Sequence, residues 1–275
     1  MFTLVAGTGY TGRRVLERLP ADRVLGLGRS AIESRRAFEQ VDFDEADSLP
    51  VSLPGRYAVL YTCPPDNEHD RRLQRFLSLL TAAPSRIVYI GTTGVYGDCR
   101  GAVVTEASPV NPGSRMSIPR VAAEKLLADW CGDRACDLVV LRAPGIYGPG
   151  RLGIGRLEQG GAVLREEDAN PGNRIHVDDL VSCCVAALSA TAPAGIYNVG
   201  DGDHRSATWF AGEVARQAAL PEPRTISRVQ AEKEFTPTRL AFLASSRVVD
   251  TTKMRQVLGI APRSPEDGIR DSLPP

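Results

Sequence analysis

Hydrophobic residues in the first half of the chain form short continuous runs that alternate with segments in which they recur at helical spacing. Strands are predicted at residues 2–6, 23–27, 57–61, 86–90 and 137–141, and a weaker one ends near Val41. Helices are predicted at residues 10–19 before Pro20, from a cap at Asn67 to about residue 82, and at residues 120–130. This alternation is typical of a parallel sheet covered by helices.

The pattern changes after Tyr147. Gly and Pro interrupt residues 148–155, residues 160–172 resemble a loop around a short strand at 162–164, and helices at 177–190 and 207–219 flank a strand at 195–199. We therefore predict an α/β fold: a Rossmann-type doubly wound parallel sheet in residues 1–150, to which 176–200 return. Residues 151–175 and 201–275, too short for an independent core, should form a small substrate lobe at the carboxyl edge of the sheet, where ligands bind.

A glycine-rich turn follows the first predicted strand and opens the first helix. Its sequence is Gly7-Thr8-Gly9-Tyr10-Thr11-Gly12, with G-x-G-x-x-G spacing. Gly7 permits a tight turn, Gly9 lets the backbone approach a diphosphate, and Gly12 lets the helix pack closely on the strand. The helix start adds unpaired N–H groups and a partial positive charge. Between a strand and a helix, this motif predicts binding of a nicotinamide dinucleotide.

The end of the second predicted strand distinguishes the two nicotinamide cofactors. A site for NAD usually has Asp or Glu there, which accepts hydrogen bonds from the ribose. This chain instead has Arg29 and Ser30, a fixed cation and a hydroxyl donor where a 2′-phosphate would lie. Arg13 and Arg14 add positive charge nearby. The sequence therefore favours NADP, with NAD as the alternative.

Composition narrows the class of partner. Lys plus Arg and Asp plus Glu both number 33, so no net charge attracts nucleic acid or an anionic membrane. No apolar run approaches the ~20 residues of a membrane span, and the first residues lack the basic start of a secretory signal. The six cysteines include no C-x-x-C pair, so we expect reduced thiols, a cytoplasmic location and no metal site. The balanced charge favours a small-molecule substrate.

Several later motifs occur in an order that resembles one enzyme family. They are the runs Val88-Tyr89-Ile90-Gly91-Thr92-Thr93-Gly94-Val95-Tyr96-Gly97, Arg142-Ala143-Pro144-Gly145-Ile146-Tyr147-Gly148-Pro149-Gly150, Ile175-His176-Val177-Asp178-Asp179 and Ile196-Tyr197-Asn198-Val199-Gly200. Together with the glycine turn they resemble the extended short-chain dehydrogenase/reductases, also called the NAD-dependent epimerase/dehydratase family. The resemblance covers nearly the whole chain.

This resemblance assigns expected roles along the cofactor. Asp42 and Phe43 should flank the adenine, whereas Thr62, Cys63 and Pro64 should pass beneath the pyrophosphate and inner ribose. Thr92 falls on the family's catalytic Ser/Thr position, and Thr93 is the next choice. Pro144 and Gly145 should border the cofactor, and Gly145, where the family often has Asn, leaves room for substrate or nicotinamide. A structural alternative for Thr92 is that its hydroxyl only stabilises the turn.

The family's catalytic Tyr and Lys are absent from this chain. Counting back from Ala122-Ala123-Glu124, which resembles the family's A-A-E, places Met116 at the Tyr position and Arg120 at the Lys position. Counting forward from Glu106 gives the same result. A thioether cannot exchange protons, and a guanidinium can donate to ribose hydroxyls but cannot act as a base. The chain thus resembles an atypical branch of the family.

Three tyrosines could replace the missing acid. Tyr96 and Tyr147 are the main candidates because they lie on loops at the carboxyl edge of the sheet, and Tyr89 is a lesser one. The alternative is that these rings only pack the loops against the sheet. His176 precedes a helix that Asp178 should cap, so we expect a structural hydrogen bond there rather than proton donation.

Two hypotheses for function follow. The first is an NADPH-dependent oxidoreductase or epimerase-like enzyme that acts on a small carbonyl or hydroxyl substrate, with Thr92, Tyr96, Tyr147 and Arg120 as its catalytic candidates. The second is a catalytically inactive NADP-binding sensor or regulatory protein, which the loss of the Tyr and Lys favours. A homodimer through the apolar helices around residues 73–80 and 121–127 is permitted by either hypothesis.

Overall fold

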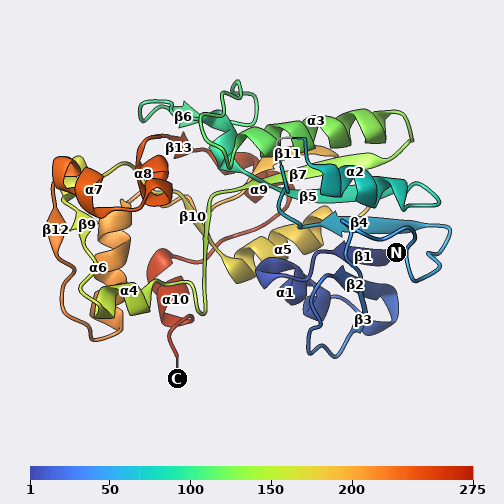
Figure 1. Ribbon diagram of the computed structural model, residues 1–275, viewed down its shortest axis with the longest axis horizontal. Coiled ribbons are helices and arrows are strands. Elements are labelled where there is room, and N and C mark those ends of the chain that lie inside the picture. Colours follow the sequence, from blue (N-terminus) through green and yellow to red (C-terminus); the bar gives the residue numbers. More distant parts are fainter. Residues whose placement is uncertain (68, 275) are drawn as a thin grey trace.

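The computed structural model describes residues 1–67 and 69–274. At its centre is a seven-stranded, all-parallel sheet with the strand order β11-β7-β5-β4-β1-β2-β3 (Figure 1). Its strands are β1 (Phe2–Ala6), β2 (Val24–Gly28), β3 (Ala37–Gln40), β4 (Tyr57–Tyr61), β5 (Arg86–Thr92), β7 (Asp137–Ala143) and β11 (Gly195–Asn198). The strand order reverses between β1 and β4, which is the topological switch point of a doubly wound sheet. The predicted Rossmann-type fold is confirmed.

Helices cover both faces of this sheet. Helices α1 (Tyr10–Arg18) and α5 (Val177–Ala187) pack on one face, whereas α2 (Arg71–Ser78) and α3 (Ile118–Gly132) pack on the other (Figure 1). Leu73, Leu77 and Leu127, which the sequence offered as dimer contacts, are buried against the sheet. Their hydrophobicity is therefore explained within one chain. None of the described helices is both long and apolar enough to cross a membrane.

A small lobe lies beyond the carboxyl ends of the strands (Figure 1). It contains β9 (Val163–Leu164), which pairs with β12 (Thr225–Ile226), and the helices α4 (Ile154–Glu158), α6 (Ala207–Gln217), α7 (Arg228–Glu234), α8 (Pro237–Leu243) and α10 (Pro265–Arg270). Two hydrophobic clusters lie within it, one around Val214 and Ile269 and one around Ile226 and Phe235. The short apolar runs of this region did not predict them.

The remaining described elements are short. They are β8 (Gly145–Tyr147) paired with β10 (Arg174–His176), β6 (Val103–Val104) paired with β13 (Val248–Val249), α9 (Thr252–Val257), and the 3-10 turns η1 (Ala21–Arg23), η2 (Thr93–Tyr96) and η3 (Glu166–Asp168).

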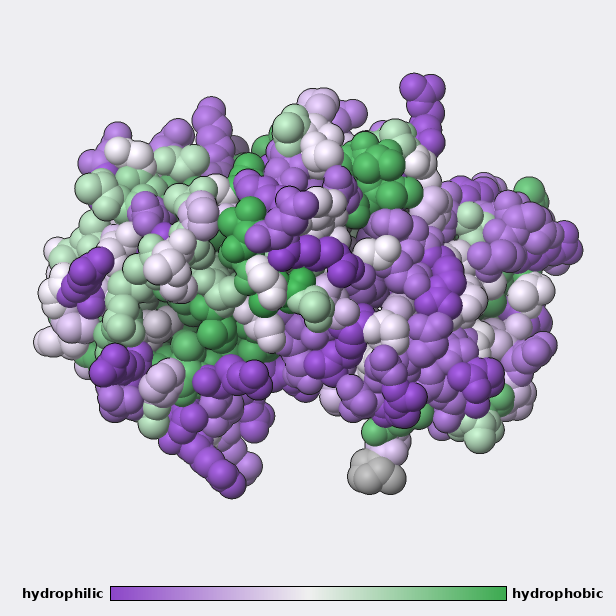
Figure 2. Space-filling view, turned by 180° about the vertical axis from the view of Figure 1, so that it is seen from behind, coloured by the Kyte–Doolittle hydropathy of each residue, from purple (hydrophilic) through white to green (hydrophobic). Residues whose placement is uncertain are grey.

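From behind, the surface over the sheet half carries more hydrophobic side chains than the mostly hydrophilic surface over the lobe (Figure 2).

Two helix starts differ from the prediction. Asn67 does not cap α2: its side chain accepts from the His69 N–H in a local turn, and Asp70 accepts from the Leu73 N–H at the helix start. At α5 the cap is His176, whose Nδ1 accepts from the Asp178 N–H, rather than Asp178 itself. In both cases a nearby polar side chain competes for the same N–H groups.

Candidate functional site

The glycine turn between β1 and α1 forms an open cradle. Gly7 has φ +98°, which favours glycine, and its N–H donates to the Leu27 carbonyl at 2.8 Å. A Cβ on Gly12 would lie 1.9 Å from the Gly7 carbonyl oxygen, so only glycine fits this contact between helix and turn. A Cβ on Gly9 would meet nothing within 4 Å. The backbone at Gly9 therefore faces open space.

The start of α1 suits an anion. Gly9 is its N-cap and has no side chain that could cap the first N–H groups, and the first turn contains no acidic residue. The N–H groups of the first turn and the helix dipole consequently favour a negatively charged group in the space beside Gly9. These features are the ones that a dinucleotide diphosphate requires.

The loop after β4 supports the cradle from below. The Thr62 hydroxyl donates to the Gly7 carbonyl at 2.6 Å, and the Thr62 N–H donates to Ala6. Cys63 is half-buried beneath the turn, where burial raises the pKa of its thiol to about 12. The Pro64 carbonyl accepts from Arg72. Thr62 and Cys63 thus lie beside the turn, and the Cys63 thiol stays protonated.

The end of β2 presents Arg29 and Ser30 to solvent, and the Arg29 carbonyl accepts from Gln40 at 2.9 Å. Gly28 lies under Thr8 of the cradle, because a Cβ there would lie 2.2 Å from the Thr8 hydroxyl. Arg29 is therefore next to the turn. The sequence analysis also expected Arg13 and Arg14 to add positive charge at this site.

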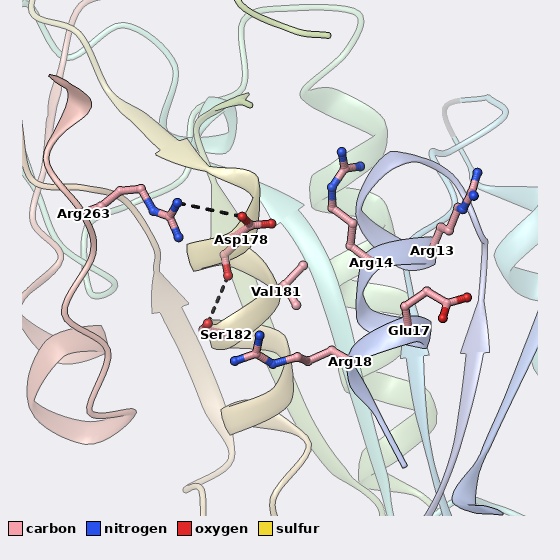
Figure 3. Close-up of a pocket in the computed structure, with 8 residues that line it drawn as sticks. All are labelled: Arg13, Arg14, Glu17, Arg18, Asp178, Val181, Ser182 and Arg263. Carbon is pink, nitrogen blue, oxygen red and sulfur yellow. Dashed lines mark hydrogen bonds and ion pairs between the residues drawn. The ribbon is translucent and has the colours of Figure 1, made fainter. Parts of the chain in front are cut away.

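Both arginines lie on α1, and Arg14 stacks on the Tyr10 ring of the cradle. Arg13 and Arg14 line a cleft of about 700 Å³ between α1 and α5 (Figure 3). Its other lining residues are Glu17, Arg18, Asp178, Val181, Ser182 and Arg263. Because Asp178 and Glu17 offset part of the charge, and Arg263 is paired with Asp179 and Asp271, the cleft is a mixed rather than a purely cationic surface.

Tyr10 connects the cradle to the loop after β8. Its hydroxyl donates to the Pro149 carbonyl at 3.0 Å, and the guanidinium carbons of Arg14 and Arg151 lie 4.1 and 3.8 Å from the centre of its ring. Such cation–π contacts are typically worth ~0.5–1 kcal/mol at exposed sites. The ring therefore holds the loop over the cofactor cradle.

The adenine end differs in detail from the expectation. Asp42 is half-buried, and its carboxylate accepts from the Asp44 N–H. The Phe43 ring is 3% exposed and packs against Phe76, with the ring centroids 5.0 Å apart. This ring belongs to the core beneath the sheet edge. A contact of Phe43 with an adenine would have to come from its backbone.

Thr92 lies at the carboxyl end of β5 and begins the turn η2. Its hydroxyl accepts from the Gly94 N–H at 3.1 Å, which is the turn-stabilising role considered as its alternative, and the side chain stays half-buried. Thr93 is 1% exposed. Of the two threonines, Thr92 alone keeps a hydroxyl that substrate could approach, since its proton is not used in the bond to Gly94.

Arg120 lies beside the end of β5. One guanidinium nitrogen donates to the Ile90 carbonyl at 3.0 Å and to the Tyr89 hydroxyl at 3.1 Å. Burial raises the pKa of Tyr89 to about 12 despite this cation, so the phenol stays neutral. Met116 is 49% exposed, next to Ser117, whose Cβ approaches Gly94 of the Thr92 turn. Residues 116 and 120 thus flank the turn that carries Thr92.

Tyr96 is held in a buried network. Its hydroxyl donates to Asn198 Oδ1 at 2.7 Å and accepts from Arg142 at 2.9 Å, and Arg142 forms a buried ion pair with Glu124. Tyr96 is 1% exposed, and burial raises the pKa of its phenol. Both hydrogen-bonding functions of the phenol are occupied, so it has no proton available for a substrate.

Tyr147 is also packed inside the molecule. Its ring contacts His176 and Phe210 edge-on, and its buried hydroxyl has no hydrogen-bond partner in the described residues. Burial raises the pKa of this phenol. His176 has the expected structural role, since Nδ1 accepts from the Asp178 N–H and Nε2 lies 3.0 Å from the Ser272 hydroxyl. Burial lowers the pKa of His176, which keeps the ring neutral.

A buried polar pair beside Cys63 was not found from the sequence. Asp70 is 0% exposed at φ +45°, and burial raises its pKa to about 6. Its Oδ2 atom and the Tyr61 hydroxyl both lack hydrogen-bond partners within the described part of the chain. In the sequence, Asp70 has the residue type of an ordinary helix cap, and no local pattern indicates that it is buried.

These features define a dinucleotide-binding class of protein: a parallel sheet with a switch point, an open glycine cradle at that point and a threonine turn beside it. Residues 69–200 match the model of the NAD dependent epimerase/dehydratase family. This segment, nearly half of the chain, is similar to that family of extended short-chain dehydrogenase/reductases.

The chain is also similar to individual proteins. The chain is 31% identical over 183 residues to "Protein YeeZ" of Escherichia coli, a match that covers 66% of this chain and 62% of that protein. It is 26% identical to a UDP-glucose 4-epimerase of Mycolicibacterium smegmatis, with 96% and 94% covered. A conserved protein of unknown function from Silicibacter pomeroyi has the same fold, with a TM-score of 0.81, 27% identity and 98% and 97% covered.

Proposed function

We propose that this protein binds NADPH and acts as an oxidoreductase or epimerase-like enzyme on a small carbonyl or hydroxyl compound. The observation that carries the proposal is the open backbone at Gly9, with Arg29 and Ser30 exposed at the end of the adjacent strand. Backbone N–H groups would bind the diphosphate and the guanidinium the 2′-phosphate. A bound nicotinamide would supply or accept the hydride.

The same geometry supports roles for residues at the other end of the cofactor. Arg120 is fixed to the Ile90 carbonyl and would donate to the ribose hydroxyls. The Thr92 hydroxyl would donate to the substrate oxygen, because its own acceptor function already serves Gly94. Gly145 is exposed between Pro144 and β10, which leaves space for a compact substrate. Tyr96 and Tyr147 would support the site by packing.

A binding and turnover experiment tests this proposal. Calorimetry should detect NADPH binding to the wild type and much weaker binding to Gly9→Asp. The substituted Cβ meets open space, so this variant should fold, while its carboxylate would repel the diphosphate. With a panel of aldehydes, ketones and nucleotide sugars, wild type should oxidise NADPH faster than Gly9→Asp. Equal rates of NADPH oxidation by wild type and Gly9→Asp across the panel would refute the proposed enzymatic function.

A second function is supported by the sequence alone, which places Met116 and Arg120 where the family has its Tyr and Lys. Neither side chain supplies that proton chemistry. The protein would then bind NADP as a sensor without turnover. Restoring both residues in Met116→Tyr/Arg120→Lys separates the two functions. Activity that appears only in the double variant favours the sensor, whereas an active wild type that loses its activity in Thr92→Val favours the enzyme.

A further inference from the structure

Two cysteines converge where α3 ends and β7 begins. Cys131 is in the last turn of α3 and Cys136 immediately precedes β7, and their Sγ atoms lie 3.5 Å apart. Their backbones also meet, because the Cys136 N–H donates to the Cys131 carbonyl at 3.4 Å. The connection passes through Ala135 at φ +38°, a conformation that non-glycine residues adopt at a cost. A strained turn thus holds two thiols together.

Both thiols border a cleft open to solvent. A cleft of about 420 Å³ between α3 and the β7–β11 edge is lined by both cysteines, together with Leu138, Ala194 and Glu124. The residues Cys131 and Cys136 are 3% and 9% exposed, and this cleft is where a small molecule can approach them. No group of three or more His, Cys, Asp or Glu residues in the described chain has a metal-binding arrangement, so the pair has no further ligands for zinc.

The environment makes the two sulfurs unequal. The hydrogen bond with Cys136 and the nearby Arg134 guanidinium lower the pKa of Cys131, whereas the same contact and burial raise the pKa of Cys136. A thiolate is the reactive form, and a second thiol beside it can resolve an oxidised sulfur. With the two sulfurs 3.5 Å apart, a thiol that is oxidised first has the other thiol beside it to resolve it.

We propose that Cys131 and Cys136 form a redox-sensitive dithiol that hydrogen peroxide converts to an intramolecular disulfide. The Cys131 thiolate attacks one peroxide oxygen: an S–O bond forms, the O–O bond breaks, and hydroxide leaves and takes up a proton as water. The Cys136 sulfur then attacks Cys131, so that an S–S bond forms and the S–O bond breaks. The second hydroxide leaves with the Cys136 proton as water. Two thiols are oxidised and one peroxide is reduced.

The other four cysteines provide internal comparisons. Cys183 and Cys184 are adjacent on α5 and fully buried, and neighbouring positions on a helix point in different directions. Cys63 has a raised pKa, and Cys99 lies near the backbone carbonyls of Tyr96 and Gly97. None of these four cysteines belongs to a pair with the geometry of Cys131 and Cys136, so oxidation should be confined to Cys131 and Cys136.

The experiment uses the folded, reduced wild-type protein. Peroxide should remove two of the six thiols together, lower the mass by two hydrogen atoms, and give one cross-linked peptide that dithiothreitol releases. Cys131 and Cys136 should be consumed faster than Cys99, because each has the other sulfur 3.5 Å away. Cys99→Ser should behave as wild type, and Cys136→Ser should stop at a sulfenic acid that dimedone traps at Cys131.

A second probe does not depend on variants. One equivalent of phenylarsine oxide, which bridges two close thiols, should protect the same two cysteines of wild type from alkylation. Two results would overturn the proposal. One is that peroxide leaves Cys131 and Cys136 open to alkylation while it oxidises other cysteines. The other is that phenylarsine oxide protects several cysteines rather than these two. Cofactor binding is not part of either readout, so these results stand apart from the proposed function.

Discussion

At the scale of single residues, the position of a residue in a motif does not determine its chemical role. Tyr96 and Thr92 occur in the same family-like run, but the structure buries one in a paired network and leaves the other hydroxyl proton available. The sequence placed both residues at the sheet edge. It could not distinguish them, because the partners of Tyr96, Arg142 and Asn198, are 46 and 102 positions away. Long-range pairing of this kind leaves no local pattern.

Removing the Tyr96 hydroxyl should therefore affect stability. In Tyr96→Phe, buried Arg142 loses an acceptor and buried Asn198 loses a donor, which typically costs ~1–3 kcal/mol. Urea unfolding should show this loss of unfolding free energy. Tyr10→Phe is the matched control, since its hydroxyl makes a single exposed bond to Pro149 and should cost less. Unchanged stability with lost turnover would make Tyr96 a chemical participant instead.

Arg29 should determine the choice of cofactor. Arg29→Ala removes the charged partner of a 2′-phosphate, and bonds to charged groups contribute ~1.5–3 kcal/mol, so NADPH affinity should fall about 10- to 100-fold. NADH affinity should be almost unchanged. Calorimetry with both dinucleotides measures this, with Arg216→Ala as control because Arg216 is exposed on α6 of the lobe, where it pairs with Glu213. An equal loss for the two cofactors would show that Arg29 does not recognise the phosphate.

At the scale of elements, regular segments were predicted better than their ends. The strand β1, the cradle and α1 follow from apolar periodicity and glycine spacing, both of which are local. The start of α2 was predicted wrongly. Asn67 and Asp70 are both good caps by residue type, and the left-handed backbone at Asp70 that selects it is set by burial in the folded chain.

Two glycines of the cradle should respond differently to the same substitution. Gly12→Ala would place a Cβ 1.9 Å from the Gly7 carbonyl oxygen, forcing α1 away from the turn, and overpacking typically costs ~1–3 kcal/mol. Gly9→Ala meets open space at φ −73° and should lose only the cost of a poorer N-cap. Thermal unfolding of both variants tests this. Similar melting temperatures would mean that the helix can move without cost.

At the scale of the whole molecule, the sheet order and the lobe arise from contacts that the sequence shows only indirectly. Alternating strands and helices predicted a doubly wound sheet, which β11 completes from a distant part of the chain. The lobe's own hydrophobic clusters combine residues near 160, 214 and 269, and each contributing run is too short to predict packing alone. Motif order indicated the resemblance to a family, but burial decided which polar groups remain available.

Asp201 makes the stability of the whole fold depend on pH. It follows β11 and is 8% exposed; its N–H donates to the Arg174 carbonyl, and its own carbonyl accepts from Arg255. Burial raises its pKa from 3.8 to about 7. The folded protein therefore holds this proton more tightly than the unfolded chain, so the contribution is fully present below pH 3.8 and is lost as pH rises through about 7.

Asp201→Asn should remove that dependence. The amide stays neutral, so the variant should gain on wild type as pH rises from 5 to 8, by a few kcal/mol at ~1.4 kcal/mol per pKa unit. Urea unfolding of both proteins across this range measures the difference, in which other titrating groups cancel. Asp203→Asn is the opposed control: although burial acts to raise its pKa, hydrogen bonds from Arg205 lower it. Its removal should destabilise the protein at every pH in this range, and a constant difference between Asp201→Asn and wild type would show that Asp201 is already ionised when folded.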